Sequence, residues 1–296
     1  MKNFVLLTLM FLSIAVFANA QAGRRTNLNA EGTILSVFAV RDKNPSEQIN
    51  FANIALYDNG IEQKINKFTF DPSPARIVLL VDNSQTLPTE VAKLQNSVKE
   101  FSYEIFDGDQ LYVAAYDEKP EIIQEWTDDA KKIETSLQTF RKKGNPALFD
   151  SLNAILEEVL RPIGLGTRKT AVVVISDGLD RSSKTKFDNT LAELQKANVT
   201  VYALQIPDRT GGAFRRDQPK PEQVLTKLTE GTGGKIFDFA EPQIAAKAIC
   251  DELRKNRYLL SYLPSNTSSY DARRLLIVGD EGITFRSKSS QPPNVK

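Results

Sequence analysis

Oxygen-bearing side chains follow directly after two apolar stretches of the chain. After "RIVLLV" come Asp82, Ser84 and Thr86, one on every second residue of "DNSQT". After "AVVVIS" comes Asp177, within "SDG". Carboxylates and hydroxyls, with no nitrogen or sulfur donor among them, are the ligands that hard divalent cations prefer. These four residues are therefore candidates for a site that binds Mg²⁺ or Mn²⁺.

The same residues have a second interpretation that needs no metal. Asp and Ser side chains commonly accept hydrogen bonds from loop amides and from the first N–H groups of a helix. Asp82, Ser84 and Thr86 could act in this way for a helix that is expected to begin near Pro88. The residues alone leave both interpretations open.

The chain contains no histidine. This excludes Ser-His and Cys-His nucleophile pairs, His-ligated zinc and any imidazole acid or base. A metal-assisted hydrolase is disfavoured as well, since no side chain supplies an evident base near neutral pH. The single cysteine, Cys250, falls on an apolar helical face, where we expect an inert core residue. We therefore expect a protein that is not an enzyme.

The charges of the chain are balanced, with 38 Lys and Arg against 37 Asp and Glu. A chain without an excess of one sign has no field that attracts nucleic acid or anionic lipid. We expect neither of them as a partner.

The N-terminal region has the pattern of a secretory signal peptide. Lys2 precedes the apolar run "FVLLTLMFLSIAVFA", which is short for a membrane span, and small residues stand at Ala18 and Ala20. We expect residues 1–20 to be removed, leaving Gln21 first and no membrane insertion afterwards. An uncleaved membrane anchor is the alternative. Cleavage implies export to the periplasm, the cell surface or the extracellular space.

Between residues 75 and 256, short apolar runs alternate with longer amphipathic stretches. Near-continuous apolar strands separated by helices are typical of a mainly parallel sheet covered on both faces. We therefore predict a doubly wound α/β domain with a six-stranded sheet. Its strands are expected at 76–82, 110–117, 121–126, 169–177, 199–206 and 234–239, and its helices at 89–106, 128–140, 147–160, 187–198, 221–231 and 241–256.

The strand order decides whether the candidate ligands can meet. Ligands of open α/β sheets bind beyond the carboxyl ends of the strands, where the strand order switches. Asp82 ends the first parallel strand and Asp177 ends the strand at 169–177. If these two strands are neighbours, both carboxylates lie at the same edge of the sheet.

The segments on either side of this domain, 21–74 and 257–288, are strand-patterned, and "DNG" from residue 58 is a strong hairpin signal. Because neither flank could bury a face alone, we expect both chain ends to pair into a small β-sandwich. The loop at 209–222 is expected to be a solvated connector or a partner contact. The composition of residues 289–296 predicts a disordered tail.

Two of these stretches resemble motifs of von Willebrand factor type A domains. "LLVDNSQT" resembles the D-x-S-x-S motif of that family, and "VVVISDG" resembles its second acidic strand end. The order of strands and helices from 75 to 256 is similar throughout. The flanks, with "YDNGIEQKINKF" before the domain and "LRKNRYLLSYLP" after it, resemble those of secreted bacterial proteins of the von Willebrand A-related type.

The resemblance implies a metal-ion-dependent adhesion site built from three loops. It assigns Asp82, Ser84 and Thr86 in the first loop and Asp177 in the third to a Mg²⁺ or Mn²⁺ ion, with an acidic residue of a protein partner completing the shell. The second loop of the family supplies a threonine, whereas "GNPALFD" has Pro146 at that place. Proline offers no side-chain oxygen, so one ligand is missing and weak metal binding is expected.

Two functions are compatible with this sequence. The first is an exported, non-enzymatic binding module that engages a protein partner through a divalent cation at the carboxyl end of the sheet. The alternative is a structural or assembly subunit of the cell envelope with a degenerate, metal-free site. Fold class alone does not decide between them.

Overall fold

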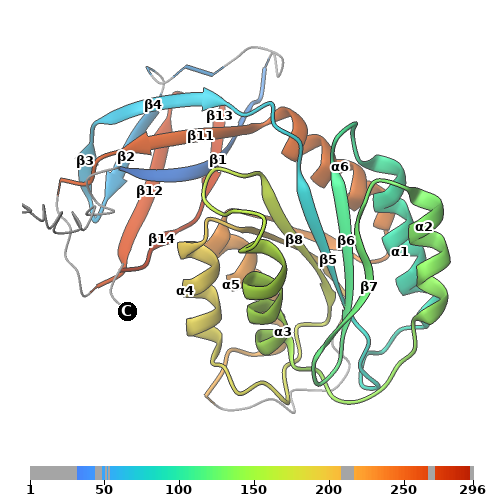
Figure 1. Ribbon diagram of the computed structural model, residues 1–296. Helices are drawn as coiled ribbons and strands as arrows, with labels where there is room; N and C mark the ends of the chain where they lie inside the picture. Colours follow the sequence, from blue (N-terminus) through green and yellow to red (C-terminus); the bar gives the residue numbers. More distant parts are fainter. Residues whose placement is uncertain are drawn as a thin grey trace, which may run out of the picture.

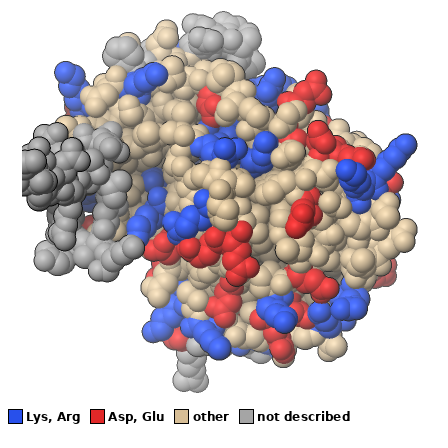
Figure 2. All heavy atoms as spheres, in the orientation of Figure 1, with Lys and Arg blue, Asp and Glu red and all other residues tan. Residues whose placement is uncertain are grey.

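The computed structural model describes residues 32–43, 49–50, 52, 54–207, 217–265 and 271–293, which form a central α/β unit and a β-sandwich beside it (Figure 1). The predicted signal peptide and most of the predicted connector at 209–222 lie outside the described residues. No helix within these ranges is long and apolar enough to cross a membrane. Basic and acidic side chains both occur over the face seen in Figure 2.

The central unit is built on a six-stranded sheet with the order β10-β9-β8-β5-β6-β7. Neighbouring strands pair in parallel from β10 to β6, and β7 joins β6 antiparallel at the edge. The predicted fold class is confirmed. The strands are β5 (Arg76–Asp82), β6 (Gln110–Tyr116), β7 (Pro120–Thr127), β8 (Thr170–Ser176), β9 (Thr200–Gln205) and β10 (Ile236–Asp238).

Helices cover both faces of this sheet, so β8 is buried along its whole length. Helices α1, α2 and α6 pack on one face and α3, α4 and α5 on the other, and each face has its own apolar core (Figure 1). A single 3₁₀ turn extends α2, and a π-helix at Ile155–Leu160 extends α3. The helices are α1 (Val91–Glu104), α2 (Ala130–Ser136), α3 (Leu148–Ala154), α4 (Phe187–Lys196), α5 (Pro221–Thr232) and α6 (Pro242–Lys255).

The two chain ends form the β-sandwich, as predicted for the fold. One sheet has the order β13-β1-β11-β4 and the other β14-β12-β2-β3, and a third apolar core contains side chains from both. Each sheet thus combines strands from the beginning and the end of the chain. The strands are β1 (Thr33–Arg41), β2 (Ile54–Asp58), β3 (Ile61–Gln63), β4 (Ile65–Phe70), β11 (Arg257–Tyr262), β12 (Arg273–Gly279), β13 (Ile283–Ser287) and β14 (Ser290–Gln291).

The start of the C-terminal tail is ordered, which corrects the prediction of disorder from residue 289 onward. Strand β14 pairs antiparallel with β12, with Gln291 opposite Arg273. The Ser289 N–H donates to the Gly231 carbonyl oxygen at 3.0 Å. Partners far away in the chain hold this polar segment, so its composition alone does not reveal its structure. Residues 294–296 lie outside the described part.

The chain passes between the two units twice, and a buried ion pair joins the two crossings. Asp71 lies between β4 and β5, and Arg257 follows α6 at the start of β11. The Arg257 guanidinium is 2 % exposed, forms an ion pair with Asp71 and donates to Ser36 Oγ on β1 at 3.1 Å. The Lys169 ammonium donates to the Asp71 carbonyl oxygen at 2.9 Å. The sandwich is therefore fastened to the central unit through polar groups that have left water.

Candidate metal-binding loops

The register of three neighbouring strands brings the predicted site residues together. Strand β5 lies between β6 and β8, with Asp82 opposite Tyr116 and Val81 opposite Ile175. The strands that end in Asp82 and Asp177 are therefore neighbours, as the site prediction required. The residue of β8 that comes level with Asp82 is Ser176, and Asp177 follows it into the third loop.

Asp82 is fully buried and hydrogen-bonded through both carboxylate oxygens. Its Oδ1 accepts from the Ser84 N–H at 2.9 Å, and its Oδ2 accepts from the Ser176 hydroxyl at 3.0 Å. The Tyr116 hydroxyl lies 3.2 Å from the same Oδ2 and 3.0 Å from Ser176 Oγ. Neutral donors from two strands and a loop thus fix the orientation of this carboxyl.

Burial dominates the electrostatics of this cluster. It raises the pKa of the Asp82 carboxyl above its ordinary value, and the hydrogen bonds from Ser84, Ser176 and Tyr116 oppose that rise. Burial also raises the pKa of Tyr116 well above its ordinary value, and the negative charge of Asp82 adds to this shift. An ionised Asp82 is therefore costly unless a positive charge lies near it. A bound cation would supply that charge.

Ser84 and Thr86 place two hydroxyl oxygens side by side. Ser84 Oγ lies 3.2 Å from Thr86 Oγ1, with Ser84 fully buried and Thr86 partly exposed. Adjacent ligands around an octahedral Mg²⁺ ion with bonds near 2.1 Å are about 3 Å apart, so this spacing suits two neighbouring ligands of one ion. The hydroxyl pair fits a small hard cation that would be reached from the side of Thr86.

Asp177 is 2 % exposed and is held by its own loop. Its Oδ1 accepts from the Leu179 N–H at 2.9 Å, across Gly178, whose φ is +82°. Its charge also contributes to the raised pKa of Tyr116, which places the Asp177 carboxylate in the electrostatic surroundings of Asp82. The third loop therefore brings a second carboxylate to the same end of the sheet.

The second loop lies between the other two and is joined to both through its backbone. The Lys143 N–H donates to the Asn83 carbonyl oxygen at 3.0 Å, and the Gly144 carbonyl oxygen accepts from the Gln85 N–H at 3.1 Å. On the other side, the carbonyl oxygen of Pro146 accepts from the Arg181 N–H at 2.9 Å. Pro146 thus supports the third loop with its backbone but has no side-chain oxygen to offer an ion.

The helix-capping interpretation of the first loop does not hold for α1. This helix begins at Val91, its N-cap position is Glu90, and that residue makes no side-chain capping bond. Asp82 and Ser84 lie earlier in the loop, where the Asp82 carboxylate accepts a hydrogen bond from the Ser84 N–H. The part of that interpretation which concerns loop amides is therefore correct, whereas the part which concerns the helix start is wrong.

Sequence reasoning missed the polar residues that surround the ligand candidates. Tyr116 ends an apolar strand and is indistinguishable from a core aromatic residue until the strand order is known. Ser176 could have been found, because it precedes Asp177 at the position that comes level with Asp82. Asp180 was also missed: its Oδ2 accepts from the Phe149 N–H at 3.1 Å and so fixes the start of α3.

The candidate ligand set carries little charge. Within the described ranges, no group of three or more His, Cys, Asp or Glu side chains lies close enough together to hold a metal ion. Two carboxylates and two hydroxyls make up the candidate ligand set. Oxygen-only donors fit Mg²⁺ or Mn²⁺ in kind, and their small number is consistent with weak binding.

The six-stranded sheet, covered by helices on both faces and with three interlinked loops at its carboxyl edge, defines a doubly wound α/β domain. Residues 77–250 match the family described as von Willebrand factor type A domain, over more than half of the chain. The chain belongs to this family. None of the curated proteins compared with the chain matches it.

Several solved structures are similar to the chain. A von Willebrand factor type A structure from Catenulispora acidiphila is 12 % identical, with a TM-score of 0.49 over 88 % of this chain and 74 % of that one. An aerotolerance-related membrane protein from Bacteroides fragilis is 16 % identical (TM-score 0.46, 61 % and 99 %). The conserved hypothetical protein BatB from Bacteroides thetaiotaomicron is 17 % identical (TM-score 0.45, 61 % and 98 %). Each TM-score is below 0.5, so these likenesses carry no information on what this chain binds.

Proposed function

We propose that this protein is an exported, non-enzymatic binding module of the secreted bacterial type, which engages a protein partner through a divalent cation. The observation that carries the proposal is the hydroxyl pair of Ser84 and Thr86, 3.2 Å apart, beside the buried Asp82 carboxyl. Domains of this family generally mediate protein–protein interaction, which supports a protein as the partner of this chain. The proposed location is the periplasm, the cell surface or the extracellular space.

Four side chains would hold the ion: Asp82, Ser84 and Thr86 from the first loop and Asp177 from the third. When bound, Mg²⁺ or Mn²⁺ would supply a Lewis-acidic point that accepts a carboxylate oxygen from an acidic residue of the partner. Pro146 contributes no ligand to this set. We therefore expect a dissociation constant on the order of 0.1 to 1 mM, at the weak end for oxygen-ligand sites.

Thermal unfolding with and without metal tests this proposal. Millimolar Mg²⁺ or Mn²⁺ is expected to raise the melting temperature relative to EDTA, by an amount set by the ratio of metal concentration to dissociation constant. Asp82→Ala is expected to abolish that shift and to leave stability in EDTA unchanged or higher, since it removes a buried charge. Asp128→Ala, which removes an exposed carboxylate next to α2, is the matched control and should keep the shift.

The assembly-subunit function is the second candidate, and one observation favours it. Neutral donors already serve both oxygens of Asp82, so the loop can be stable with no ion bound. In that case Mg²⁺ and Mn²⁺ leave the melting temperature of the wild type unchanged. Asp82→Ala then costs about 1 kcal/mol with or without EDTA, the usual value of a lost loop hydrogen bond. This pair of results would replace the cation-bridged function with constitutive assembly contacts.

A further inference from the structure

A groove of about 660 Å³ lies at the same end of the central sheet as the candidate metal-binding loops. It is bounded by the starts of α1 and α6 and by the segments that follow β9 and β10. This volume is in the range of sites that enclose small ligands or parts of a peptide. Its lining includes Pro88, Ala92, Lys93, Ile206, Phe239 and Pro242.

The groove lies close to the candidate site, as two observations show. Pro88 follows Thr86 by two residues on the first loop, so their Cα atoms are at most about 7 Å apart. On the other side, the Ile206 N–H donates to the Ser176 carbonyl oxygen at 2.9 Å, and the Ser176 hydroxyl donates to Asp82. The hydroxyl pair and the groove are therefore neighbours at this end of the sheet, close enough for one segment of a partner to contact both.

The lining of the groove is suited to an apolar side chain. Ile206 is 3 % exposed, and Phe239 packs against the apolar core under α1 and α6, so the floor is rigid. Pro88 and Pro242 add apolar walls that carry no N–H donor. An aliphatic or aromatic side chain would exclude water from this surface and gain the free energy of apolar burial.

The rim of the groove offers donors to a polypeptide backbone. The first N–H groups of a helix have no acceptor within that helix, and no side chain caps the start of α1. Lys93 adds a cationic donor on the same first turn. Asp238, the acidic residue of the lining, already accepts from the Ala240 N–H at 2.8 Å. Donors at the border of an apolar groove suit an extended segment, whose carbonyl oxygens need partners.

We propose that the groove binds an apolar side chain of the same protein segment whose acidic residue reaches the candidate metal site. The proposal rests on the proposed function for the acidic half of this contact. Since an extended chain advances about 3.3 Å per residue, the acidic and apolar residues of the partner are separated by about two to four positions. The recognised unit is a short linear motif with one acid and one large apolar residue.

Defined peptides measure this requirement directly. The probes are fluorescent twelve-residue Ser/Gly peptides with one Asp and one Leu, separated by one to eight positions, added to the full chain in 5 mM Mg²⁺ (a concentration about fivefold or more above the expected dissociation constant). Binding is expected to be tightest at separations of two to four. Replacing Leu by Ser in the best peptide is expected to weaken binding about tenfold or more, the factor for one buried apolar side chain.

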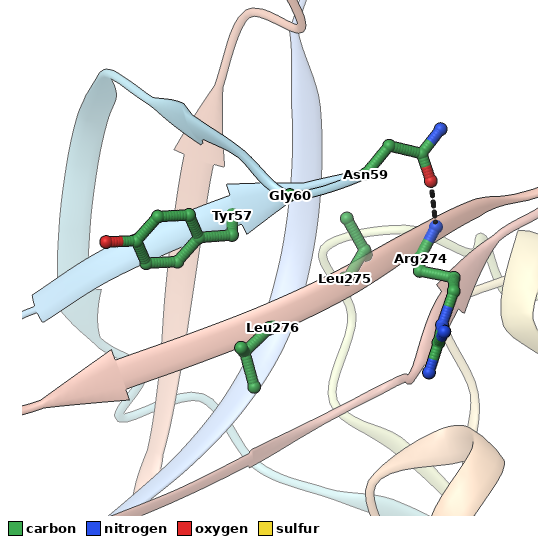
Figure 3. Close-up of a pocket in the computed structure, with 6 residues that line it drawn as sticks. All are labelled: Tyr57, Asn59, Gly60, Arg274, Leu275 and Leu276. Atoms are coloured by element: carbon green, nitrogen blue, oxygen red, sulfur yellow. Dashed lines mark hydrogen bonds between the residues drawn. The ribbon is translucent and has the colours of Figure 1, made fainter.

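Variants on the protein locate the bound side chain. Ala92 is exposed on the first turn of α1, so Ala92→Glu puts a charge into the groove without disturbing the core. The control is Leu276→Glu in a second hollow of about 640 Å³ on the sandwich (Figure 3). There Leu276 is 58 % exposed and stands opposite Tyr57 on the neighbouring strand. Ala92→Glu is expected to lose peptide binding about tenfold and to keep the Mg²⁺-dependent rise in melting temperature. Leu276→Glu should change neither.

The outcomes separate the groove from the metal site. If the peptides bind Ala92→Glu as tightly as the wild type, or if they bind equally well with Leu replaced by Ser, the proposal that the groove binds an apolar side chain is wrong. The proposed metal site is not affected by that result. The groove is overturned also if Leu276→Glu is the variant that loses binding, or if no peptide binds at 1 mM, about the upper limit for a weak oxygen-ligand interaction. Leu-dependent binding that survives EDTA and Asp82→Ala supports the groove and refutes the cation bridge.

Discussion

Asp82 combines two properties that oppose each other in the folded chain. It is fully buried, and the donors that reach it are the neutral groups of Ser84, Ser176 and Tyr116. Burial raises its pKa, and these hydrogen bonds recover part of the cost of the ionised form. A position of this kind favours either a proton or a metal ion on the carboxyl. The pH dependence of stability can therefore report on the site.

The sign of this dependence follows from the direction of the shift. Because the folded-state pKa of Asp82 lies above its unfolded value, the protonated carboxyl stabilises the fold at low pH. That contribution is lost as pH rises through the raised pKa. In EDTA, Asp82→Asn should melt close to the wild type below pH 4, near the ordinary pKa of 3.8, and above it at pH 7. Melting curves from pH 3.5 to 7.5 measure this difference.

Bound metal should reduce the difference in melting temperature between Asp82→Asn and the wild type, because it stabilises only the wild type. At pH 7, Mg²⁺ is expected to raise the melting temperature of the wild type towards that of Asp82→Asn and to leave the variant where it was. Asp188→Asn, on the exposed first turn of α4, is the matched control and should show no such pattern. A gap between Asp82→Asn and the wild type that stays constant with pH would contradict a raised pKa at Asp82.

The polar cluster around Asp82 shows which site residues could be found from the sequence and which could not. The carboxylates and hydroxyls could be picked out because oxygen-bearing residues after an apolar strand are unusual and carry their own chemistry. Tyr116 could not, since its role depends on β6 lying beside β5 and on the register that sets it opposite Asp82. A tyrosine at the end of an apolar strand is otherwise a core residue. Contacts that depend on register are visible only in the folded chain.

The helices and strands of the central unit were predictable because burial on both faces imposes simple patterns. β8 is seven residues long, without one exposed position, and α1 places buried residues at three- and four-residue spacing. The short strand β14 had no such signal, because two polar residues have no period. The π-helix after α3 was not predictable either, since its apolar pattern continues that of the α-helix. Local pattern determined the long elements, and tertiary pairing determined the short ones.

The third loop depends on a glycine for its conformation. Gly178 has a φ of +82°, and a Cβ at this position would overlap the carbonyl oxygen of Pro221 at the start of α5. Gly178→Ala is therefore expected to lower the free energy of unfolding by about 2 kcal/mol or more, from backbone strain and overlap together. Urea unfolding measures the loss. Since Asp177 and Leu179 are hydrogen-bonded across this glycine, the Mg²⁺-dependent rise in melting temperature should shrink as well.

Gly164 supplies the control for the backbone strain alone. Its φ is +86°, but a Cβ there would meet no atom within 4 Å. Gly164→Ala is expected to cost about 1 kcal/mol, the strain of a non-glycine residue in the left-handed region, and to leave the metal response intact. Equal losses of unfolding free energy in the two variants would mean that overlap with Pro221 adds nothing to the cost of Gly178→Ala.

The two units of the molecule are held together by buried and partly buried polar groups as well as by apolar contact. Arg286 on β13 forms an ion pair with Glu252 on α6 and donates to the Gly233 carbonyl oxygen at 2.8 Å. The Lys288 ammonium donates to the carbonyl oxygen of Gln195 on α4 at 2.8 Å, and burial lowers its pKa to about 7. Such groups are costly to bury and become more costly when a partner is lost. The interface therefore favours one fixed arrangement of sandwich and central unit.

Arg257 is the group on which this arrangement depends most, because it joins the two crossings of the chain. Its guanidinium is 2 % exposed and forms an ion pair with Asp71, which is 6 % exposed. Arg257→Met leaves that carboxylate buried without its cation and is expected to cost about 3 to 5 kcal/mol. Adding Asp71→Asn removes the uncompensated charge and should recover part of the loss. Arg161→Met, which breaks an exposed ion pair with Glu157, should cost at most about 1 kcal/mol.

Urea unfolding followed by two probes tests the coupling of the units. The single tryptophan, Trp126, reports on the central sheet, where its ring packs on Tyr112, while circular dichroism reports on the whole chain. The two transitions are expected to coincide in the wild type, as for one cooperative unit. In Arg257→Met, the sandwich should unfold first, because both of its sheets contain strands from the two chain ends that this ion pair joins. Transitions that still coincide in Arg257→Met, with a loss below about 1 kcal/mol, would show that the ion pair of Arg257 and Asp71 is not needed to couple the units.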